Sequence, residues 1–119
     1  MGLYHVYNFK VLGALCLIDQ GELDWKLLVV DQAFSKEMGI RTIEQYKQQN
    51  PAALEEIMEW LRKIKTYDGK PANWFDYDDQ VLSVEKTIEI ISENHQAYKD
   101  LLAGKVDNSS KLNLERQNI

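Results

Sequence analysis

The chain has 119 residues, which is enough for one domain with a modest core. Its 14 basic and 19 acidic residues give a formal charge of −5, and this argues against nucleic acid as a partner, because phosphate backbones are bound by basic surfaces. Hydrophobic residues make up 45% and charged residues 28%, a balance that excludes a fibrous or disordered chain.

Targeting and membrane signals predict a cytoplasmic location. The longest apolar stretch, residues 11–18, is too short to span a bilayer, so we expect no membrane partner. Residues 1–5 lack the basic region and cleavage site of a signal peptide. The single cysteine, Cys16, excludes an intrachain disulfide and is consistent with a reducing compartment.

The first part of the sequence predicts a β-hairpin. Residues 4–19 are rich in aromatic, aliphatic and β-branched side chains, which suit a pleated surface, and residues 25–30 form a second such run. The polar residues around Gly21 separate the two runs. We expect the loop to comprise residues 20–23.

Helices are expected in the rest of the chain. Thr42 and Gln45 have the spacing of a capping box, and Asn50 followed by Pro51 indicates the start of a second helix. Gly69 is expected to end this helix. Its aliphatic stripe, typical of a face packed on a core, comprises Leu54, Ile57, Met58, Leu61 and Ile64.

A last helix is expected after an irregular segment, residues 71–82. Ser83 is a candidate N-cap and Gly104 a candidate stop. One face of this helix is expected to be buried, and its residues are Val84, Ile88, Ile91, His95, Tyr98 and Leu102. The sequence therefore predicts an α+β fold in which a β-hairpin is followed by two or three helices. Residues 106–119 are expected to form a polar tail.

Three charged residues beside the hairpin loop are candidate site residues. With a loop of residues 20–23, Asp19 and Asp24 would face each other across the strands, with Cβ atoms about 5 Å apart. Lys26 would project from the same face. Carboxylates suit Mg²⁺ and a lysine suits phosphate oxygens, so one interpretation is a metal site beside an anion site. The other is a solvated hairpin tip in which Lys26 pairs with Asp24.

Other polar groups are weaker candidates. The acidic run at residues 76–79 could attract a cation, but a solvated loop is the simpler interpretation. No cysteine or second histidine stands at ligand spacing for zinc, and the sequence contains no glycine-rich phosphate loop.

The hairpin sequence resembles a known family. Residues 11–26, VLGALCLIDQGELDWK, closely resemble a hairpin of the family I soluble inorganic pyrophosphatases of eukaryotic type, VLGALALIDEGETDWK. Residues 60–73, WLRKIKTYDGKPAN, are similar to the family's WFRxYKxPDGKPxN segment, and residues 95–105 to its HxxWxxLxxGK helix. The resemblance implies that residues 1–105 are the C-terminal part of the catalytic domain, a partial OB-like barrel of antiparallel strands.

The resemblance also implies Mg²⁺-dependent hydrolysis of pyrophosphate to two phosphates. Asp19 and Asp24 would be metal ligands, and a water bridging two of three or four Mg²⁺ ions would be the nucleophile. Lys26 and Lys65 would bind phosphate oxygens.

Two departures from the family pattern matter. Ile64 stands where the family has a phosphate-binding tyrosine, and Tyr67 is a candidate replacement because it lies nearly one turn further on. The family's Asp-x-Asp-Pro-x-Asp run, its main source of metal ligands, does not occur in this sequence.

We therefore expect this chain alone to be inactive and to carry no complete catalytic set. We also expect it to self-associate or to recruit a chain that supplies the missing N-terminal half, because an open barrel has free strand edges. The alternatives are a non-catalytic pyrophosphatase-like binding or assembly protein and an unrelated α+β interaction module.

Overall fold

The computed structural model describes residues 5–107, which fall into two compact units. One unit covers residues 7–87, and the other includes the described residues from 88 onward. The elements in chain order are β1 (Phe9–Asp19), β2 (Glu22–Asp31), α1 (Gln32–Met38), α2 (Ile43–Gln49), α3 (Ala53–Lys63), η1 (Ile64–Asp68), β3 (Trp74–Phe75), η2 (Tyr77–Asp79) and α4 (Val84–Leu102). The expected α+β class is confirmed, with four α-helices in the described part rather than two or three.

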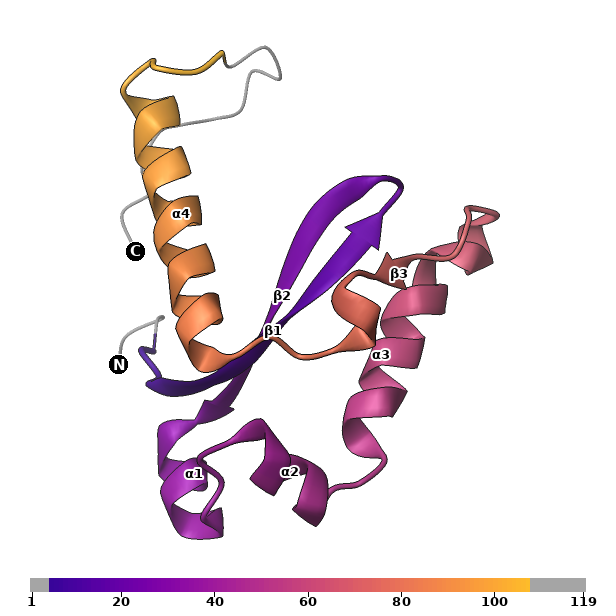
Figure 1. Ribbon diagram of the computed structural model, residues 1–119, viewed down its shortest axis with the longest axis vertical. Coiled ribbons are helices and arrows are strands. Elements are labelled where there is room, and N and C mark those ends of the chain that lie inside the picture. The colour runs from indigo at the N-terminus through magenta and orange to yellow at the C-terminus, as the bar shows by residue number, and fades with distance from the viewer. Residues whose placement is uncertain (1–4, 108–119) are drawn as a thin grey trace. The chain divides into compact units, whose positions relative to one another are not determined.

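A long twisted hairpin organises the unit of residues 7–87 (Figure 1). Its turn consists of Gln20 and Gly21 alone, with φ angles of 53° and 80°. A two-residue turn with two positive φ angles matches the right-handed twist of the flanking strands. The expected four-residue loop is therefore wrong. Asp19 lies opposite Glu22, and Asp24 lies opposite Leu17, so the two aspartates are not a directly facing pair.

The central strand is β1, in a three-stranded antiparallel sheet ordered β2-β1-β3. The register shifts between Val11 and Gly13, where the ladder bulges. At Gly13 a Cβ atom would lie 2.6 Å from the carbonyl oxygen of Leu82, so only glycine leaves room for that segment. The Leu82 N–H donates to the Ala14 carbonyl at 2.8 Å, which holds the segment against β1.

The core lies between this sheet and helices α2 and α3. Cys16, on β1, is also buried. The buried cluster comprises Leu12, Leu15, Leu17, Ile40, Ile43, Leu54, Met58 and Phe75. In Figure 1, α3 lies alongside the hairpin, while α1 and α2 lie near the end opposite its turn.

The helix signals were confirmed in part. Thr42 and Gln45 form the capping box that their spacing predicts, at the start of α2. The prediction that Asn50 begins the next helix is wrong, because Asn50 caps the C-terminus of α2 and α3 starts at Ala53. After α3 the chain tightens into the 3-10 helix η1, and Gly69 ends it in the left-handed conformation with a φ of 76°.

Strand β2 has one unpaired edge within the described part of the chain, since its ladder runs to β1. Three of its hydrophobic side chains, Leu23, Leu27 and Val29, are exposed. A hollow of about 210 Å³ lies beside this strand, lined by Leu12, Leu27, Leu28, Val29, Val30, Ile43, Tyr46, Leu54 and Ile57. An exposed apolar strand edge is a surface that further strands can pair with.

The final helix, α4, begins and ends as the sequence predicts. The Lys86 N–H donates to Ser83 Oγ at 3.1 Å, and Gly104 lies in the left-handed conformation with a φ of 74°. The expectation of one buried face is wrong for most of its residues, since Ile88, His95 and Leu102 are among those exposed. No helix in residues 5–107 has the length and apolar character needed to cross a membrane. The expected tail, residues 106–119, lies almost wholly outside the described residues, so it stays a prediction.

Candidate functional site

The hairpin register places one set of charged side chains on a single sheet face. Residues that pair across an antiparallel ladder point to the same side, and side chains two positions apart share a face. Asp19 and its partner Glu22, together with Asp24 and Lys26, therefore project from one face at the turn end of the hairpin. Asp19 and Asp24 are diagonal neighbours there, a geometry that brings Cβ atoms to roughly 7 Å.

A lysine from another element joins this face. Lys65 Nζ donates to Asp19 Oδ1 at 2.7 Å and to Asp19 Oδ2 at 2.6 Å. The Asp19 side chain is 19% exposed and that of Lys65 is 36% exposed, so the pair is partly shielded from water. The structure thus brings together two residues that are 46 positions apart, a contact that neither periodicity nor spacing indicated.

The second lysine pairs with the second aspartate. Lys26 Nζ lies 3.0 Å from Asp24 Oδ2, as the interpretation of a paired hairpin tip predicts. Leu15 and Leu17, which lie on the same sheet face further along β1, are buried. Two ammonium groups and two carboxylates thus neutralise each other in pairs above an apolar base.

The position of Lys65 depends on how α3 is held. Leu54 and Met58 anchor α3 in the core, and Lys65 follows in η1 without a break.

The segment after η1 folds back on the end of α3, where Asn73 is buried. The Asn73 N–H donates to the Arg62 carbonyl at 2.9 Å, and Asn73 Nδ2 donates to the Leu61 carbonyl at 3.0 Å. Asn73 therefore satisfies carbonyls that the helix end leaves free. Asn73 is the last residue of the segment similar to DGKPxN, and this similarity was the sequence signal that could have identified its structural role.

Arg62 links α3 to the rest of the site-bearing unit. Its guanidinium lies 2.9 Å from Glu55, 3.2 Å from Glu59 and 3.6 Å from Asp79, and it stacks 5.3 Å from the centre of the Phe75 ring. A hydrogen bond to Glu55 and the neighbouring carboxylates raise the pKa of Arg62. This cluster fixes the end of α3, and η1, which carries Lys65, follows directly.

The described residues fit a hard metal ion in donor type but not in donor number. Carboxylate oxygens suit Mg²⁺. Within residues 5–107, however, no three His, Cys, Asp or Glu side chains group closely enough to hold a metal. The acidic run at residues 76–79 has other roles, because Asp76 Oδ1 accepts the Tyr77 N–H and Asp79 pairs with Arg62. Metal binding by Asp19 and Asp24 stays a prediction.

Ile64 and Tyr67, the two residues that depart from the family pattern, both lie in η1. The Tyr67 side chain is 85% exposed, and its role in binding phosphate stays a prediction.

The chain is similar to known proteins over most of its length. A family model described as inorganic pyrophosphatase matches residues 2–99. The chain is 38% identical over 109 residues to soluble inorganic pyrophosphatase 1, chloroplastic, of Chlamydomonas reinhardtii, covering 92% of this chain and 39% of that protein. It is 40% identical over 99 residues to the mitochondrial inorganic pyrophosphatase of Saccharomyces cerevisiae, covering 83% of this chain and 32% of that protein.

Solved structures of inorganic pyrophosphatases are also similar to this chain. Type I inorganic pyrophosphatase from Toxoplasma gondii superposes with a TM-score of 0.75 at 28% identity, over 85% of this chain and 44% of that one. The enzyme from Schistosoma japonicum gives 0.72 at 32% identity, over 78% of this chain and 33% of that one. The chain spans only about a third to two fifths of the curated relatives described above. On the matched residues and the shared fold, the chain belongs to the inorganic pyrophosphatase family.

Proposed function

We propose that this chain is part of a Mg²⁺-dependent enzyme that hydrolyses inorganic pyrophosphate to two phosphates. Asp19 and Asp24 would be metal ligands, while Lys26 and Lys65 would bind phosphate oxygens. The observation that carries this proposal is the convergence of these four side chains from β1, β2 and η1 on one face. Two carboxylates beside two ammonium groups match a substrate that consists of metal ions and phosphate oxygens.

The ion pairs suggest how the residues would act. Each aspartate pairs with a lysine in this structure, and Lys65 holds both oxygens of Asp19, so a cation that binds these carboxylates would compete with the ammonium groups. The released lysines would then donate to phosphate oxygens and hold the negative charge of the substrate. Bound Mg²⁺ would lower the pKa of a coordinated water and so supply the nucleophile. The cation would bind the aspartates and the phosphate would bind the lysines. Binding of either one would therefore weaken the aspartate–lysine pairs and favour binding of the other.

The residues present would not complete such a site. Two carboxylates fall short of the six oxygen ligands that Mg²⁺ usually takes from protein, water and substrate together. The rest of the family's length, in the same polypeptide or in another, would supply the remaining ligands. The free edge of β2 and the apolar hollow beside it are where further strands would pair. We propose that the 119-residue chain alone is inactive, and that it self-associates or recruits a chain that supplies this part.

The test measures phosphate release from pyrophosphate and Mg²⁺, using chain verified by intact mass. The chain alone should not exceed the uncatalysed rate. Mixing it with a second chain that carries the family's Asp-x-Asp-Pro-x-Asp half should restore turnover, and Asp19→Asn should abolish it while Asp31→Asn leaves it unchanged. Asp31 is a matched control because its carboxylate caps α1 and it lies at the end of β2 opposite the hairpin turn. Turnover by the chain alone would show that the set of ligands is complete.

A non-catalytic binding or assembly protein is the second candidate, favoured by Ile64, which lacks a hydroxyl where the family has a tyrosine. In that case the complemented mixture would bind phosphate without hydrolysing pyrophosphate. Replacing Tyr67 with phenylalanine in an active mixture tests whether Tyr67 supplies the missing hydroxyl. A cytoplasmic location is also a proposal, since the relatives above are named for a chloroplast and a mitochondrion.

A further inference from the structure

Asn73 is a buried polar residue whose two donors both bond to the end of α3. The residue is 5% exposed. Its backbone N–H donates to the Arg62 carbonyl, and its Nδ2 donates to the Leu61 carbonyl. Its Oδ1 is buried and has no hydrogen-bond partner within residues 5–107. A buried acceptor without a partner lowers stability. The two donors, rather than this oxygen, are therefore what asparagine contributes at position 73.

These two bonds close a loop that carries Lys65. The loop, here called the Lys65 loop, consists of residues 62–73 and contains η1. Within it the Lys70 N–H donates to the Lys65 carbonyl at 3.2 Å. The backbone of Lys65 is thus bonded to the second half of the loop, and Asn73 bonds that half to α3.

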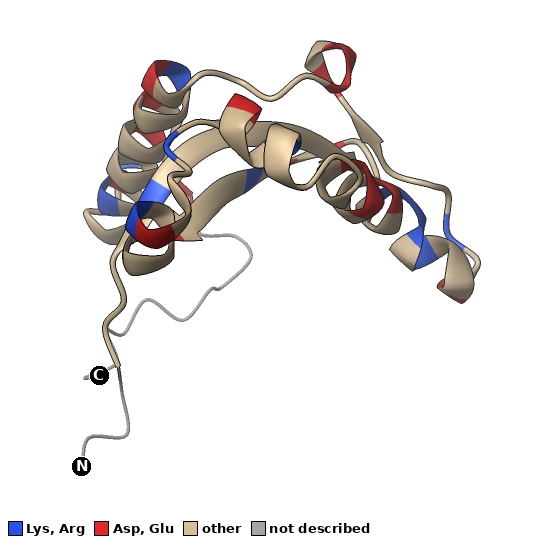
Figure 2. Ribbon diagram, turned by 90° about the horizontal axis from the view of Figure 1, so that it is seen from below, with Lys and Arg blue, Asp and Glu red and all other residues tan. Residues whose placement is uncertain are grey.

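The Lys65 loop is basic, and its cations form ion pairs in two directions. It has four basic side chains and one acidic one. Figure 2 shows blue bands at the end of α3 and in the chain that follows it. Arg62 and Lys63 pair with glutamates of α3. Lys65 instead reaches Asp19 on β1. The pair that Lys65 forms therefore depends on where the loop lies relative to the sheet.

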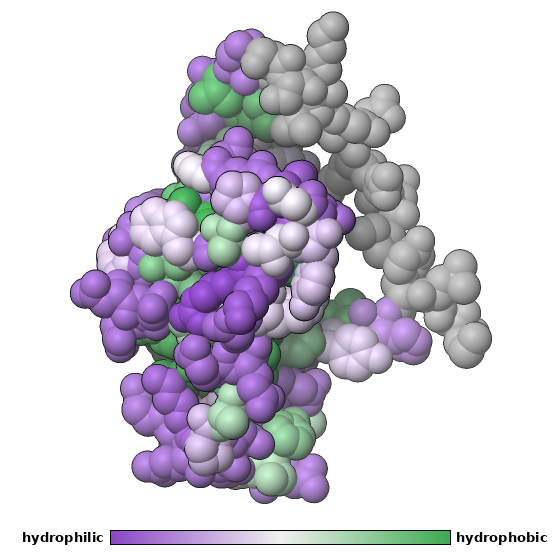
Figure 3. All heavy atoms as spheres, turned by 90° about the vertical axis from the view of Figure 1, so that its right-hand side faces the viewer, coloured by the Kyte–Doolittle hydropathy of each residue, from purple (hydrophilic) through white to green (hydrophobic). Residues whose placement is uncertain are grey.

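Little packing holds the second half of the Lys65 loop. Residues 66–72 are all exposed, and the first buried residue after them is Asn73. Purple and pale atoms dominate the side of the molecule on which α3 and this loop lie (Figure 3). A segment with few buried contacts opens readily unless hydrogen bonds at its base close it. The bonds of Asn73 are therefore a main restraint on this part of the loop.

Asn73 also connects the loop to the strand that carries Asp19. The next two residues form β3, in which Trp74 pairs with Ile18 on β1. One position further along this register, Asn73 is the counterpart of Asp19. Because Asn73 is bonded to α3 and continuous with β3, it fixes the spacing between the helix end and the end of β1. Lys65 Nζ spans this spacing to reach both oxygens of Asp19, at 2.7 and 2.6 Å.

We propose that Asn73 is a positioning residue for Lys65. By closing the Lys65 loop at its base, it keeps the ammonium group on both oxygens of Asp19. Such a contact needs an accurately placed ammonium, and the flexible four-carbon stem of lysine does not supply that placement. When the loop is released, Lys65 points into water for more of the time and competes less for Asp19. Asn73 would thereby set how readily a cation binds, and this last step alone rests on the proposed function.

Asn73→Leu in the 119-residue chain tests the proposal, because leucine has the same branched shape but its side chain donates no hydrogen bond. The first measurement needs no metal: a double-mutant cycle of Asp19→Asn and Lys65→Met, read from urea unfolding. The coupling between these two positions should lose at least half of its value in the Asn73→Leu background. Ser35→Ala is the matched control, since the Ser35 hydroxyl is similarly buried and donates to the Ile40 carbonyl beyond α1. It should leave the coupling unchanged.

The second measurement is titration calorimetry with Mn²⁺. Asn73→Leu should lower the dissociation constant about threefold, which is half, in free energy, of a tenfold loss of competition. In a chain that already carries Lys65→Met, the same change should have no effect, because no ammonium is left to position. A contribution to general stability would not depend on Lys65 in this way.

Three results would each overturn the proposal: an unchanged coupling in Asn73→Leu, an equal loss of coupling in Ser35→Ala, or a gain in Mn²⁺ affinity that persists in Lys65→Met. Absence of Mn²⁺ binding in every variant would instead refute the proposed role of Asp19 as a metal ligand, and the metal-free cycle would still decide the role of Asn73. Circular dichroism checks that each variant is folded. Asn73→Ala, which needs less space, replaces Asn73→Leu if leucine prevents folding.

Discussion

Replacing Lys65 with methionine should make the chain bind divalent cations more tightly. Lys65 Nζ holds both oxygens of Asp19, at 2.6 and 2.7 Å, so a cation that needs this carboxylate competes with an ammonium group. Methionine keeps the unbranched stem and removes only the charge and its donors. The variant therefore separates competition for Asp19 from the packing of η1.

The size of the effect follows from the exposure of the pair. A fully exposed ion pair contributes about 0–1 kcal/mol, and removing one partner of a buried pair costs about 3–5 kcal/mol. With Asp19 19% and Lys65 36% exposed, the pair lies between these limits, at about 1.5 kcal/mol. Since about 1.4 kcal/mol is a factor of ten, Lys65→Met should lower the dissociation constant for Mn²⁺ or Mg²⁺ about tenfold.

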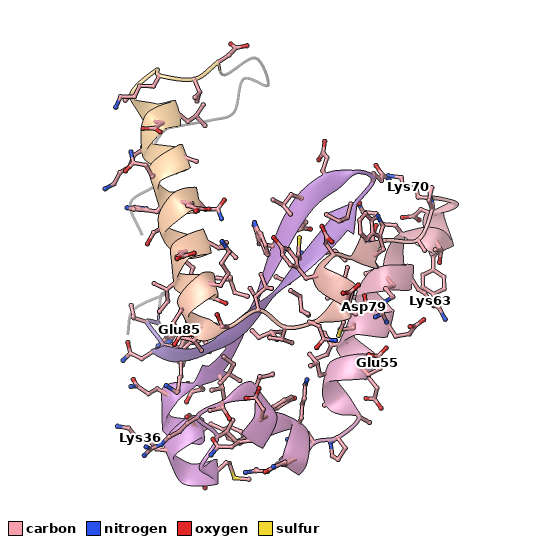
Figure 4. All side chains as sticks on the ribbon, in the orientation of Figure 1. Lys36, Glu55, Lys63, Lys70, Asp79 and Glu85 are labelled. Carbon is pink, nitrogen blue, oxygen red and sulfur yellow. The ribbon has the colours of Figure 1, made fainter. Side chains whose placement is uncertain are left out.

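Titration calorimetry with Mn²⁺ in phosphate-free buffer measures this directly. Lys36→Met is the matched control, because it removes the same charge from α1, and Figure 4 shows Lys36 far from the hairpin turn. Added phosphate should tighten Mn²⁺ binding to the unaltered chain and have much less effect on Lys65→Met, because the released lysine is then absent. The reasoning fails if Lys65→Met binds Mn²⁺ no more tightly than the unaltered chain, or if Lys36→Met gains as much.

Three further outcomes concern the fold. Gly13→Ala should lower the free energy of unfolding in urea by about 2–3 kcal/mol, because the added methyl would meet the Leu82 carbonyl oxygen at 2.6 Å. Gln20→Asn should raise it by about 0.5–1 kcal/mol, since asparagine tolerates the positive φ of 53° better than glutamine. The hydrogen bond from Lys63 lowers the pKa of Glu59, so their pair stabilises the fold above the ordinary glutamate pKa and is lost as the pH falls through the lowered value. The thermal midpoint should thus fall less on acidification in Glu59→Gln than in the unaltered chain.

Local signals in the sequence predicted which helices and strands form better than they predicted where each one begins and ends. The apolar runs and the capping box of Thr42 specified the hairpin and α2, because they report burial and backbone hydrogen bonding within a few residues. The sequence predicts a loop of residues 20–23, whereas the turn consists of Gln20 and Gly21 alone. A two-residue turn is hard to predict here, because glutamine rarely adopts the left-handed conformation that Gln20 has. The sequence predicts that Asn50 begins a helix, because asparagine followed by proline is typical of that position. In the structure its backbone N–H donates to the Tyr46 carbonyl and closes α2 instead. Strand β3 has only two residues and depends on β1, so no local pattern marks it.

The contacts of the candidate site, too, could be predicted from the sequence only in part. Alternation along β2 was enough to place Asp24 and Lys26 on one face, and their ion pair followed from that placement. The contact between Asp19 and Lys65 depends on how α3 packs on the sheet, which residue types and spacing do not specify. Only the resemblance to a known family connected the two segments before the structure did.

The ion pairs also change the argument for catalysis. Two carboxylates beside each other would be costly without cations, and this cost alone would favour a metal enzyme over a scaffold without activity. In the structure, however, Lys65 and Lys26 offset that cost by pairing with the two aspartates, so the cost does not by itself favour a metal enzyme. In the proposed enzyme, a cation that competes for the two aspartates would make the lysines available on the face where phosphate oxygens would lie. Coupled binding of Mn²⁺ and phosphate is therefore the property that a merely structural pair would lack.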